Sequence, residues 1–170
     1  MSILDIKTYP DAFLKQKSEP VEQNDRGLQQ LIDDMAETMR EASGVGLAAP
    51  QVGVHKRLIV IDARDCEGDR ALLALINPEI VSADELIDSE EGCLSVPGVT
   101  LHIKRAGKLL IKGLDRDFNA VEFEATGLLA RALQHEIDHL DGVLIVDRLS
   151  AIKREFFEKR YKKAHKEQTV

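Results

Sequence analysis

The sequence predicts a single α+β domain in which mostly antiparallel strands pack around one buried helix, with a further helix at the C-terminus. Three observations support this prediction. Apolar residues recur at helical spacing over residues 27–42 and 127–141. Residues 121–125 alternate between apolar and charged side chains, which is typical of a strand with one solvated face. The length of 170 residues fits one domain with a substantial core.

The remaining elements follow from short local patterns. A turn or short helix is expected after Pro10, and the glycines at 44 and 46 end the helix 27–42. Five segments rich in aliphatic residues are expected to be strands, the third of them only weakly: 57–62, 72–76, 79–87, 108–114 and 121–125. The last two would form a hairpin around the polar turn 115–119.

Composition narrows the class of protein. With 44% hydrophobic and 31% charged residues, the chain resembles an ordinary soluble globular protein. It has no N-terminal apolar signal region and no apolar run near 18 residues, so we expect neither secretion nor membrane spanning, and a cytoplasmic location. The absence of Trp argues against nucleic-acid recognition by base stacking. Two cysteines, Cys66 and Cys93, are too few for a disulfide framework and remain available as metal ligands in a reducing compartment.

Charge is distributed unevenly along the chain. Residues 151–170 contain seven basic and three acidic residues, a net charge of +4, which leaves −11 for residues 1–150 out of the total of −7. A cationic helical tail on an acidic body suggests an electrostatic contact, for example with nucleic acid. The simpler interpretation is a solvated terminal helix of the same domain, whose charges only aid solubility.

The most informative motif is H-E-x-x-H at residues 135–139, within the predicted helix 127–141. His135 and His139 lie one turn apart and about 40° apart around the helix axis, so one metal ion can bind both rings. Glu136 faces the same side and can reach a water on the metal without being a ligand. This arrangement is typical of metal-assisted hydrolysis and predicts that residues 1–150 form a catalytic metallohydrolase domain.

The pattern of this helix favours a metal site over a chance match on a solvated surface. Its apolar and polar residues form two opposite arcs: Leu129, Ala132, Leu133, Ile137 and Leu140 against Arg131, Gln134, Asp138 and Asp141. Both histidines and Glu136 fall at the border of the apolar arc together with Leu128, where burial without partners would be costly. Thr126 is the expected N-cap and Gly142 the expected left-handed stop.

A hydrolytic metal site needs a third protein ligand. The metzincin proteases place a histidine where this chain has Ile145, which cannot bind a metal. Thermolysin-like proteases use a glutamate farther along, but Glu155 and Glu158 lie in the charged tail. Cys93 remains, preceded by Gly92, which permits close approach of the backbone. A lone cysteine is usually a small buried hydrophobic residue, but beside H-E-x-x-H a thiolate would complete a tetrahedral site with one open position.

A third segment, G-V-G-L-A-A-P-Q at residues 44–51, combines small residues with an amide side chain. Its glycines and alanines leave room for the backbone of a ligand, and Gln51 offers an amide donor. Gly-rich turns after helices are also common without any ligand. The segment is not a phosphate-binding loop, because it lacks the Lys-Ser/Thr ending and does not follow a strand.

Together the three segments resemble the peptide deformylase family. All three motifs of that family are present in the family's order: G-V-G-L-A-A-P-Q at 44–51, E-G-C-L-S at 91–95 and Q-H-E-I-D-H at 134–139. The similarity covers residues 3–150. The resemblance implies a metal-dependent hydrolase that removes the formyl group from the N-terminal formyl-methionine of nascent proteins and releases formate.

The resemblance also implies roles for individual residues. Three residues would bind the metal, physiologically Fe(II) with Zn(II), Ni(II) or Co(II) as substitutes: Cys93, His135 and His139. Glu136 would take a proton from water and later deliver it to the leaving amine. The backbone N–H of Leu94 and the side chain of Gln51 would stabilise the developing oxyanion.

The substrate would contact a further set of residues. Val45, Leu128 and Ala132 are expected to line the methionine pocket, and Gly46 to pair with the substrate backbone as an added strand. Many relatives carry an arginine where this chain has Thr100, and two basic residues follow nearby: Lys104 and Arg105. By comparison with relatives whose C-terminal helix docks on the ribosome, the tail would hold the enzyme near the exit of nascent chains.

Two other functions are consistent with the residues alone. A zinc endopeptidase would activate water in the same way but would cleave internal peptide bonds. A metal-stabilised RNA-binding module with a basic tail would have a closed structural site. It would need a fourth ligand, and the three candidates lack supporting motifs: Cys66, His55 and His102.

Overall fold

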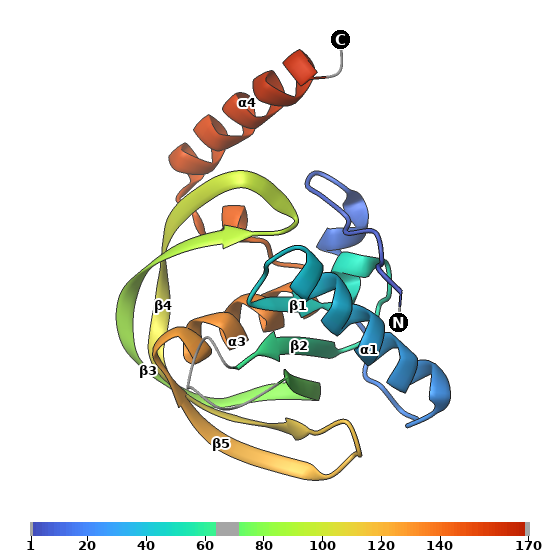
Figure 1. Ribbon diagram of the computed structural model, residues 1–170. Coiled ribbons are helices and arrows are strands. Elements are labelled where there is room, and N and C mark those ends of the chain that lie inside the picture. Colours follow the sequence, from blue (N-terminus) through green and yellow to red (C-terminus); the bar gives the residue numbers. More distant parts are fainter. Residues whose placement is uncertain (1, 64–71, 169–170) are drawn as a thin grey trace.

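The computed structural model describes residues 2–63 and 72–168, and over these residues it has the predicted α+β architecture (Figure 1). Five strands form one antiparallel sheet in the order β1-β2-β3-β4-β5. The strands are β1 (Gly46–Ala48), β2 (Leu58–Asp62), β3 (Leu72–Cys93), β4 (Val96–Leu114) and β5 (Ala120–Thr126). The helices are α1 (Arg26–Glu41), α3 (Gly127–Leu140) and α4 (Ala151–Gln168), with short 3-10 turns η1 (Ala12–Lys15), η2 (Ala49–Val52) and η3 (Ile145–Arg148).

β2 lies between two helices, which explains why all five of its residues are buried. Ile59 and Ile61 pack in one apolar cluster with α3, whereas Leu58 and Val60 pack in a second cluster with α1. A strand covered on both faces shows a continuous apolar run rather than alternation. Full burial of each such side chain stabilises the fold by about 1.5–3 kcal/mol. The predicted strand 57–62 and the predicted helix 27–42, which corresponds to α1, are both confirmed to within one residue at each end.

β3 and β4 are much longer than the sequence pattern predicts. The expected strands 72–76 and 79–87 are both parts of β3, and the expected strand 108–114 is only the end of β4. The sequence pattern does not predict residues 88–93 and 96–107, which also belong to these strands. The expected segment 79–87 is mostly exposed, which explains its weak strand pattern. Three register shifts between β3 and β4 interrupt the ladder and allow the strands to bend. Figure 1 shows the two strands curving around α3.

α3 lies inside this curve and carries the H-E-x-x-H motif. Gly142, just beyond it, has the predicted left-handed backbone with a φ of 75°. Thr126 occupies the N-cap position, but its side chain makes no capping hydrogen bond. One prediction for this helix is wrong. Asp138 does not lie on a solvated arc but is buried, because Arg105 and Arg148 both bind its carboxylate.

α4 projects from the body of the molecule (Figure 1) and corresponds to the predicted tail helix. Its apolar residues Phe157 and Tyr161 are buried and pack edge-on against Tyr9, near the N-terminus. The tail is therefore anchored by aromatic contacts. No helix within residues 2–63 and 72–168 is long and apolar enough to cross a membrane.

Candidate metal centre and active site

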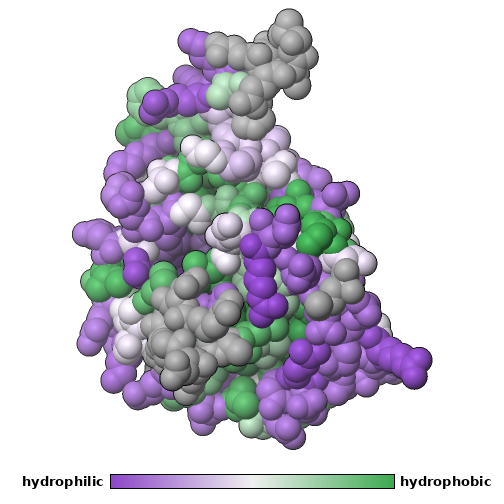
Figure 2. Space-filling model, in the orientation of Figure 1, coloured by the Kyte–Doolittle hydropathy of each residue, from purple (hydrophilic) through white to green (hydrophobic). Residues whose placement is uncertain are grey.

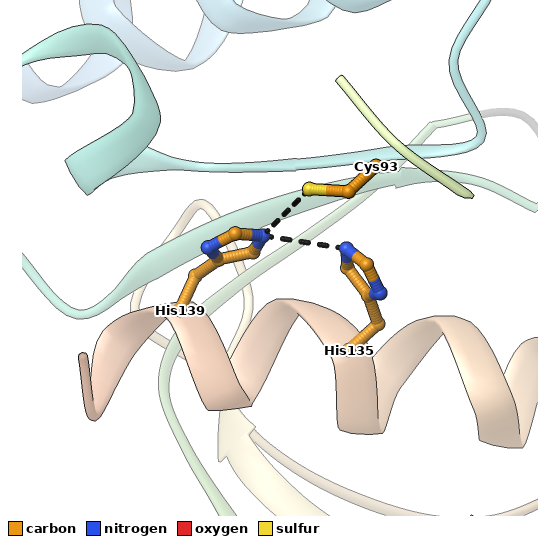
Figure 3. A group of neighbouring side chains, drawn as sticks. All are labelled: Cys93, His135 and His139. Atoms are coloured by element: carbon orange, nitrogen blue, oxygen red, sulfur yellow. Dashed lines mark hydrogen bonds between the residues drawn. The ribbon is translucent and has the colours of Figure 1, made fainter. Parts of the chain in front are cut away.

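The three predicted metal ligands lie together (Figure 3). Cys93 is the last residue of β3, and His135 and His139 are one turn apart on α3. The Sγ atom of Cys93 lies 3.3 Å from Nε2 of His139, which lies 3.3 Å from Nε2 of His135. All three donor atoms lie within 4.8 Å of one another. The curved sheet thus brings the thiol of Cys93 next to the imidazole rings of His135 and His139, which lie far away in the sequence.

The donor set fits a single metal ion. In a tetrahedral site with metal–sulfur bonds near 2.3 Å and metal–nitrogen bonds near 2.0–2.1 Å, neighbouring donor atoms lie roughly 3.3–3.6 Å apart. Two ring nitrogens that face each other can share only one proton, whereas a cation satisfies both lone pairs. Over the residues that the structure describes, the group has three members. Three protein ligands are typical of an open catalytic site, while a closed structural site has four, which argues against the RNA-binding alternative.

A buried network of charges orients His135. Burial alone would raise the pKa of Glu91, but hydrogen bonds from Arg105 and His135 lower it to about 2. Arg105 donates to both carboxylate oxygens of Glu91 at 2.8 Å and to Asp138 at 2.6 Å. The Nδ1 atom of His135 lies 3.0 Å from Oε1 of Glu91. Because an ionised carboxylate can only accept, Nδ1 carries the proton and Nε2 keeps its lone pair for the metal.

Glu136 lies beside the ligands without joining them. It is 4% exposed, and its Oε1 atom lies 3.9 Å from Nε2 of His135. Its Oε2 atom has no hydrogen-bond partner within the described parts of the chain. Burial raises the pKa of Glu136 to about 7. A carboxyl group with a pKa near neutrality and a free oxygen can both accept and release a proton at physiological pH.

Gln51 and Leu94 flank the cysteine. The amide of Gln51 is buried, with its Oε1 accepting from the backbone N–H of Ala48 at 2.9 Å and its Nε2 donating to Ser95 at 3.0 Å. The same Nε2 atom lies 3.9 Å from Sγ of Cys93. Leu94 follows Cys93 in the tight turn between β3 and β4. Hydrogen bonds therefore fix Gln51 near Cys93, and Leu94 lies beside Cys93 in the chain.

A cavity of about 600 Å³, the catalytic cavity, opens in front of these groups. Nearly all predicted site residues line it: Val45, Gly46, Gln51, Cys93, Leu94, Leu128, Ala132, His135 and Glu136. His139 is instead buried, at 1% exposure. A Cβ atom on Gly46 would lie only 3.0–3.1 Å from the side chain of Glu136. Glycine is needed here because β1 passes so close to the glutamate.

Several residues of the site have no clear signal in the sequence. Arg131 and residues 97–100 also line the catalytic cavity, and Nε of Arg131 is buried without a partner in the described structure. The contacts among Glu91, Arg105 and Asp138 join separate elements, so no local pattern could reveal them.

The other candidates from the sequence do not join the centre. Lys104, near Thr100, forms an exposed ion pair with Asp88, and Arg105 binds buried carboxylates; neither residue lines the catalytic cavity. His55 and His102 do not belong to the group of potential ligands. Cys66 lies outside the described residues.

This fold and this site define a metal-dependent hydrolase. Comparison with known proteins gives the family. A family model of polypeptide deformylases matches residues 3–155. The chain therefore belongs to the polypeptide deformylase family, whose metal-dependent members remove the formyl group from the N-terminus of nascent peptides. Membership favours the deformylase over the endopeptidase alternative.

Individual relatives match along the whole chain. The peptide deformylase of Thermodesulfovibrio yellowstonii is 57% identical over 162 residues, which cover 95% of this chain and 98% of the relative. That of Syntrophobacter fumaroxidans is 52% identical over the full length of both. The crystal structure of a peptide deformylase from Legionella pneumophila has a TM-score of 0.89 at 47% identity, covering 98% of each chain. The Ehrlichia chaffeensis enzyme in complex with actinonin has a TM-score of 0.90 at 43% identity, covering both chains fully.

Proposed function

We propose that Cys93, His135 and His139 hold the catalytic metal ion of this deformylase and that Glu136 carries the proton of the reaction. The convergence of three donor atoms beside a buried glutamate with a free oxygen supports these roles. When bound, the metal ion would lower the pKa of a water molecule and polarise the formyl oxygen.

Glu136 manages proton transfer in both halves of the reaction. Its Oε2 atom accepts a proton from the water that adds to the formyl carbon. The same carboxyl group then donates this proton to the amine nitrogen as the C–N bond breaks, which releases formate and a free N-terminal amine. A pKa near 7 suits a group that must serve first as base and then as acid.

Gln51 and Leu94 stabilise the negative charge that develops on the formyl oxygen. The Nε2 atom of Gln51 and the backbone N–H of Leu94 are two donors near Cys93, and the hydrogen bonds of Gln51 with Ala48 and Ser95 hold its amide in place. Preorganised donors of this kind typically contribute about 10²–10³ in rate.

The substrate backbone extends the sheet at β1. Among the residues that the structure describes, this strand pairs with β2 only and forms an edge of the sheet, and its first residue, Gly46, lines the catalytic cavity. An extended peptide can add to such an edge through main-chain hydrogen bonds. The methionine side chain then reaches the wall formed by Val45, Leu128 and Ala132, which places the formyl group at the metal centre.

The resident metal is proposed to be Fe(II), with Zn(II), Ni(II) or Co(II) as functional substitutes. One thiolate and two imidazoles form a mixed soft and intermediate donor set that suits these ions rather than Mg²⁺ or Ca²⁺. Anaerobic purification followed by elemental analysis tests this assignment. Iron at about one equivalent per chain supports it, and stoichiometric zinc after strictly anaerobic handling contradicts it.

Residues 1–150 are proposed to be the catalytic domain and residues 151–170 its basic tail, which contacts the ribosome in the cytoplasm, where formylated chains emerge. The exposed basic residues of α4 and its anchoring by Phe157 and Tyr161 support this role. Co-sedimentation with ribosomes should be lost when 151–170 are deleted. Full binding by the truncated enzyme contradicts the ribosome contact.

The decisive experiment for the catalytic roles replaces one side chain. Glu136→Ala should retain the metal, because the three ligands are unchanged. The rate of formate release from formyl-methionyl peptides should fall by about 10²–10⁴-fold. Elemental analysis and a formate assay on the same preparation check both expectations. Unchanged turnover in this variant excludes Glu136 as the proton carrier.

A further inference from the structure

A second hollow, the α4 groove, lies next to the catalytic cavity. It has a volume of about 710 Å³ and lies between residues 97–102, at the start of β4, and one face of α4. The α4 side consists of residues at helical spacing: Lys153, Phe156, Phe157, Arg160, Tyr161 and Ala164. None of these residues takes part in the chemistry described above.

The α4 groove borders the catalytic cavity. Residues 97–100 line both hollows, and they follow the metal ligand Cys93 by only a few positions. These residues are therefore a common wall of the two hollows. A peptide that passes over residues 97–100 as it leaves the catalytic cavity would come to the groove.

The groove combines an aromatic surface with positive charge. Phe157 and Tyr161 are buried in its floor, while Phe156 is 64% exposed, a high value for a large aromatic side chain. Lys153 and Arg160 lie one turn before and one turn after Phe156, and both are exposed. Figure 2 shows hydrophobic residues where the otherwise hydrophilic α4 meets the body. Such a surface complements a peptide segment with apolar and acidic side chains.

We infer that the α4 groove binds the part of the nascent peptide downstream of the formyl-methionine and favours segments in which an apolar side chain neighbours an acidic one. The inference rests on the proposed placement of the formyl group at the metal centre. An extended chain spans about 3.3–3.6 Å per residue, so eight residues cover about 26–29 Å and three only about 10 Å. A tripeptide thus stays in the catalytic cavity, whereas an octapeptide reaches the groove.

The test measures kcat/KM of the metal-loaded, full-length enzyme for three substrates. These are formyl-Met-Ala-Ser, an octapeptide that continues this tripeptide with leucine and glutamate residues, and a matched octapeptide that continues it with serine and lysine residues. The wild-type enzyme should favour the leucine–glutamate octapeptide over the tripeptide by about five- to tenfold. The serine–lysine octapeptide should gain about twofold or less.

Two variants probe the two chemical properties of the groove. Phe156→Ala should remove the advantage of the leucine–glutamate octapeptide, and Arg160→Glu should reverse the order of the two octapeptides. Ile152→Ala is the apolar control, because Ile152 is 70% exposed on the same helix but does not line the groove. Lys162→Glu is the charge control on the opposite face of α4. Neither control variant should change kcat/KM for any of the three substrates.

Each contrary outcome has a distinct meaning. Equal rates for the tripeptide and both octapeptides in the wild-type enzyme overturn the inference, as do equal effects of Phe156→Ala and Ile152→Ala. Loss of ribosome binding by Phe156→Ala with unchanged peptide kinetics also overturns it and assigns the groove to the ribosome. Failure of the wild-type enzyme to process the tripeptide contradicts instead the proposed placement of the formyl group.

Discussion

At the scale of single residues, the site depends on side chains that never touch the metal. Glu91 fixes the proton on Nδ1 of His135, and Arg105 keeps Glu91 ionised although it is buried. The same guanidinium binds Asp138 on α3, so one arginine joins β3, β4 and the helix of the ligands. Orientation of a ligand by such an outer partner commonly determines metal affinity as strongly as a direct contact.

Replacing Glu91 should therefore weaken metal binding. We expect Glu91→Ala to lower the affinity of the apo-enzyme for metal by about 10–100-fold, because His135 loses the acceptor that sets its tautomer. It also leaves Arg105 without one of its two partners, which lowers the free energy of unfolding. Competition with a chromogenic chelator measures the affinity. Glu122→Ala, at an exposed position of β5, is the control, and equal affinities for the two variants contradict the role of Glu91.

At the scale of elements, the long hairpin of β3 and β4 has two parts that differ in burial. Its inner part is buried in the core, while residues 79–88 are mostly exposed and extend the curve around α3. Asn77 marks the boundary, with a left-handed φ of 51° and side-chain hydrogen bonds to both backbone groups of Val21. Asparagine tolerates this backbone better than most residues, which explains its place at the first register shift.

Two leucines of the same strand should differ sharply in their contribution to stability. Leu75 is fully buried and Leu86 is 76% exposed. Leu75→Ala should lower the free energy of unfolding by about 2–5 kcal/mol, because it leaves a cavity in the core. Leu86→Ala should change it by no more than about 0.5 kcal/mol. Urea unfolding of the metal-loaded enzyme measures both, and similar losses would show that the outer hairpin is packed as tightly as the core.

At the scale of the whole molecule, the metal centre links parts that are far apart in the chain. Cys93 ends the curved hairpin, and the two histidines lie on the helix that the hairpin surrounds. An ion bound by all three therefore connects the sheet to α3. Since the unfolded chain does not hold these groups together, binding stabilises the folded state by mass action.

Removing the metal should lower both activity and stability. At a free metal concentration of about 100 times Kd, the bound ion contributes about 2.7 kcal/mol to the free energy of unfolding, and this stabilisation should disappear in chelator. Thermal unfolding with and without chelator measures the change, and added metal should restore activity. Cys93→Ala is the control, because it already lacks a ligand. A chelator effect of equal size in this variant would place the stabilising ion elsewhere.

The sequence was most informative where a structure depends on neighbouring residues. Helical spacing predicted α1 and α3 closely, the continuous apolar run predicted β2, and the i, i+4 spacing predicted that the two histidines lie side by side. It failed for residues 88–93 and 96–107, which extend β3 and β4 beyond the expected segments, and for Asp138, whose burial is due to arginines on other elements.

By itself, the sequence determined which chemical groups were available: a thiol, two imidazoles one helical turn apart, and a glutamate on the same face. The tertiary structure decided how they meet, through the bend of β3 and β4, the edge position of β1, the charge network behind His135 and the groove beside α4. The physical reason is the separation along the chain over which each interaction acts. Helix and strand periodicity arise between neighbours in the chain, whereas bends, ion pairs and cavities arise from packing between segments that only the folded protein brings together.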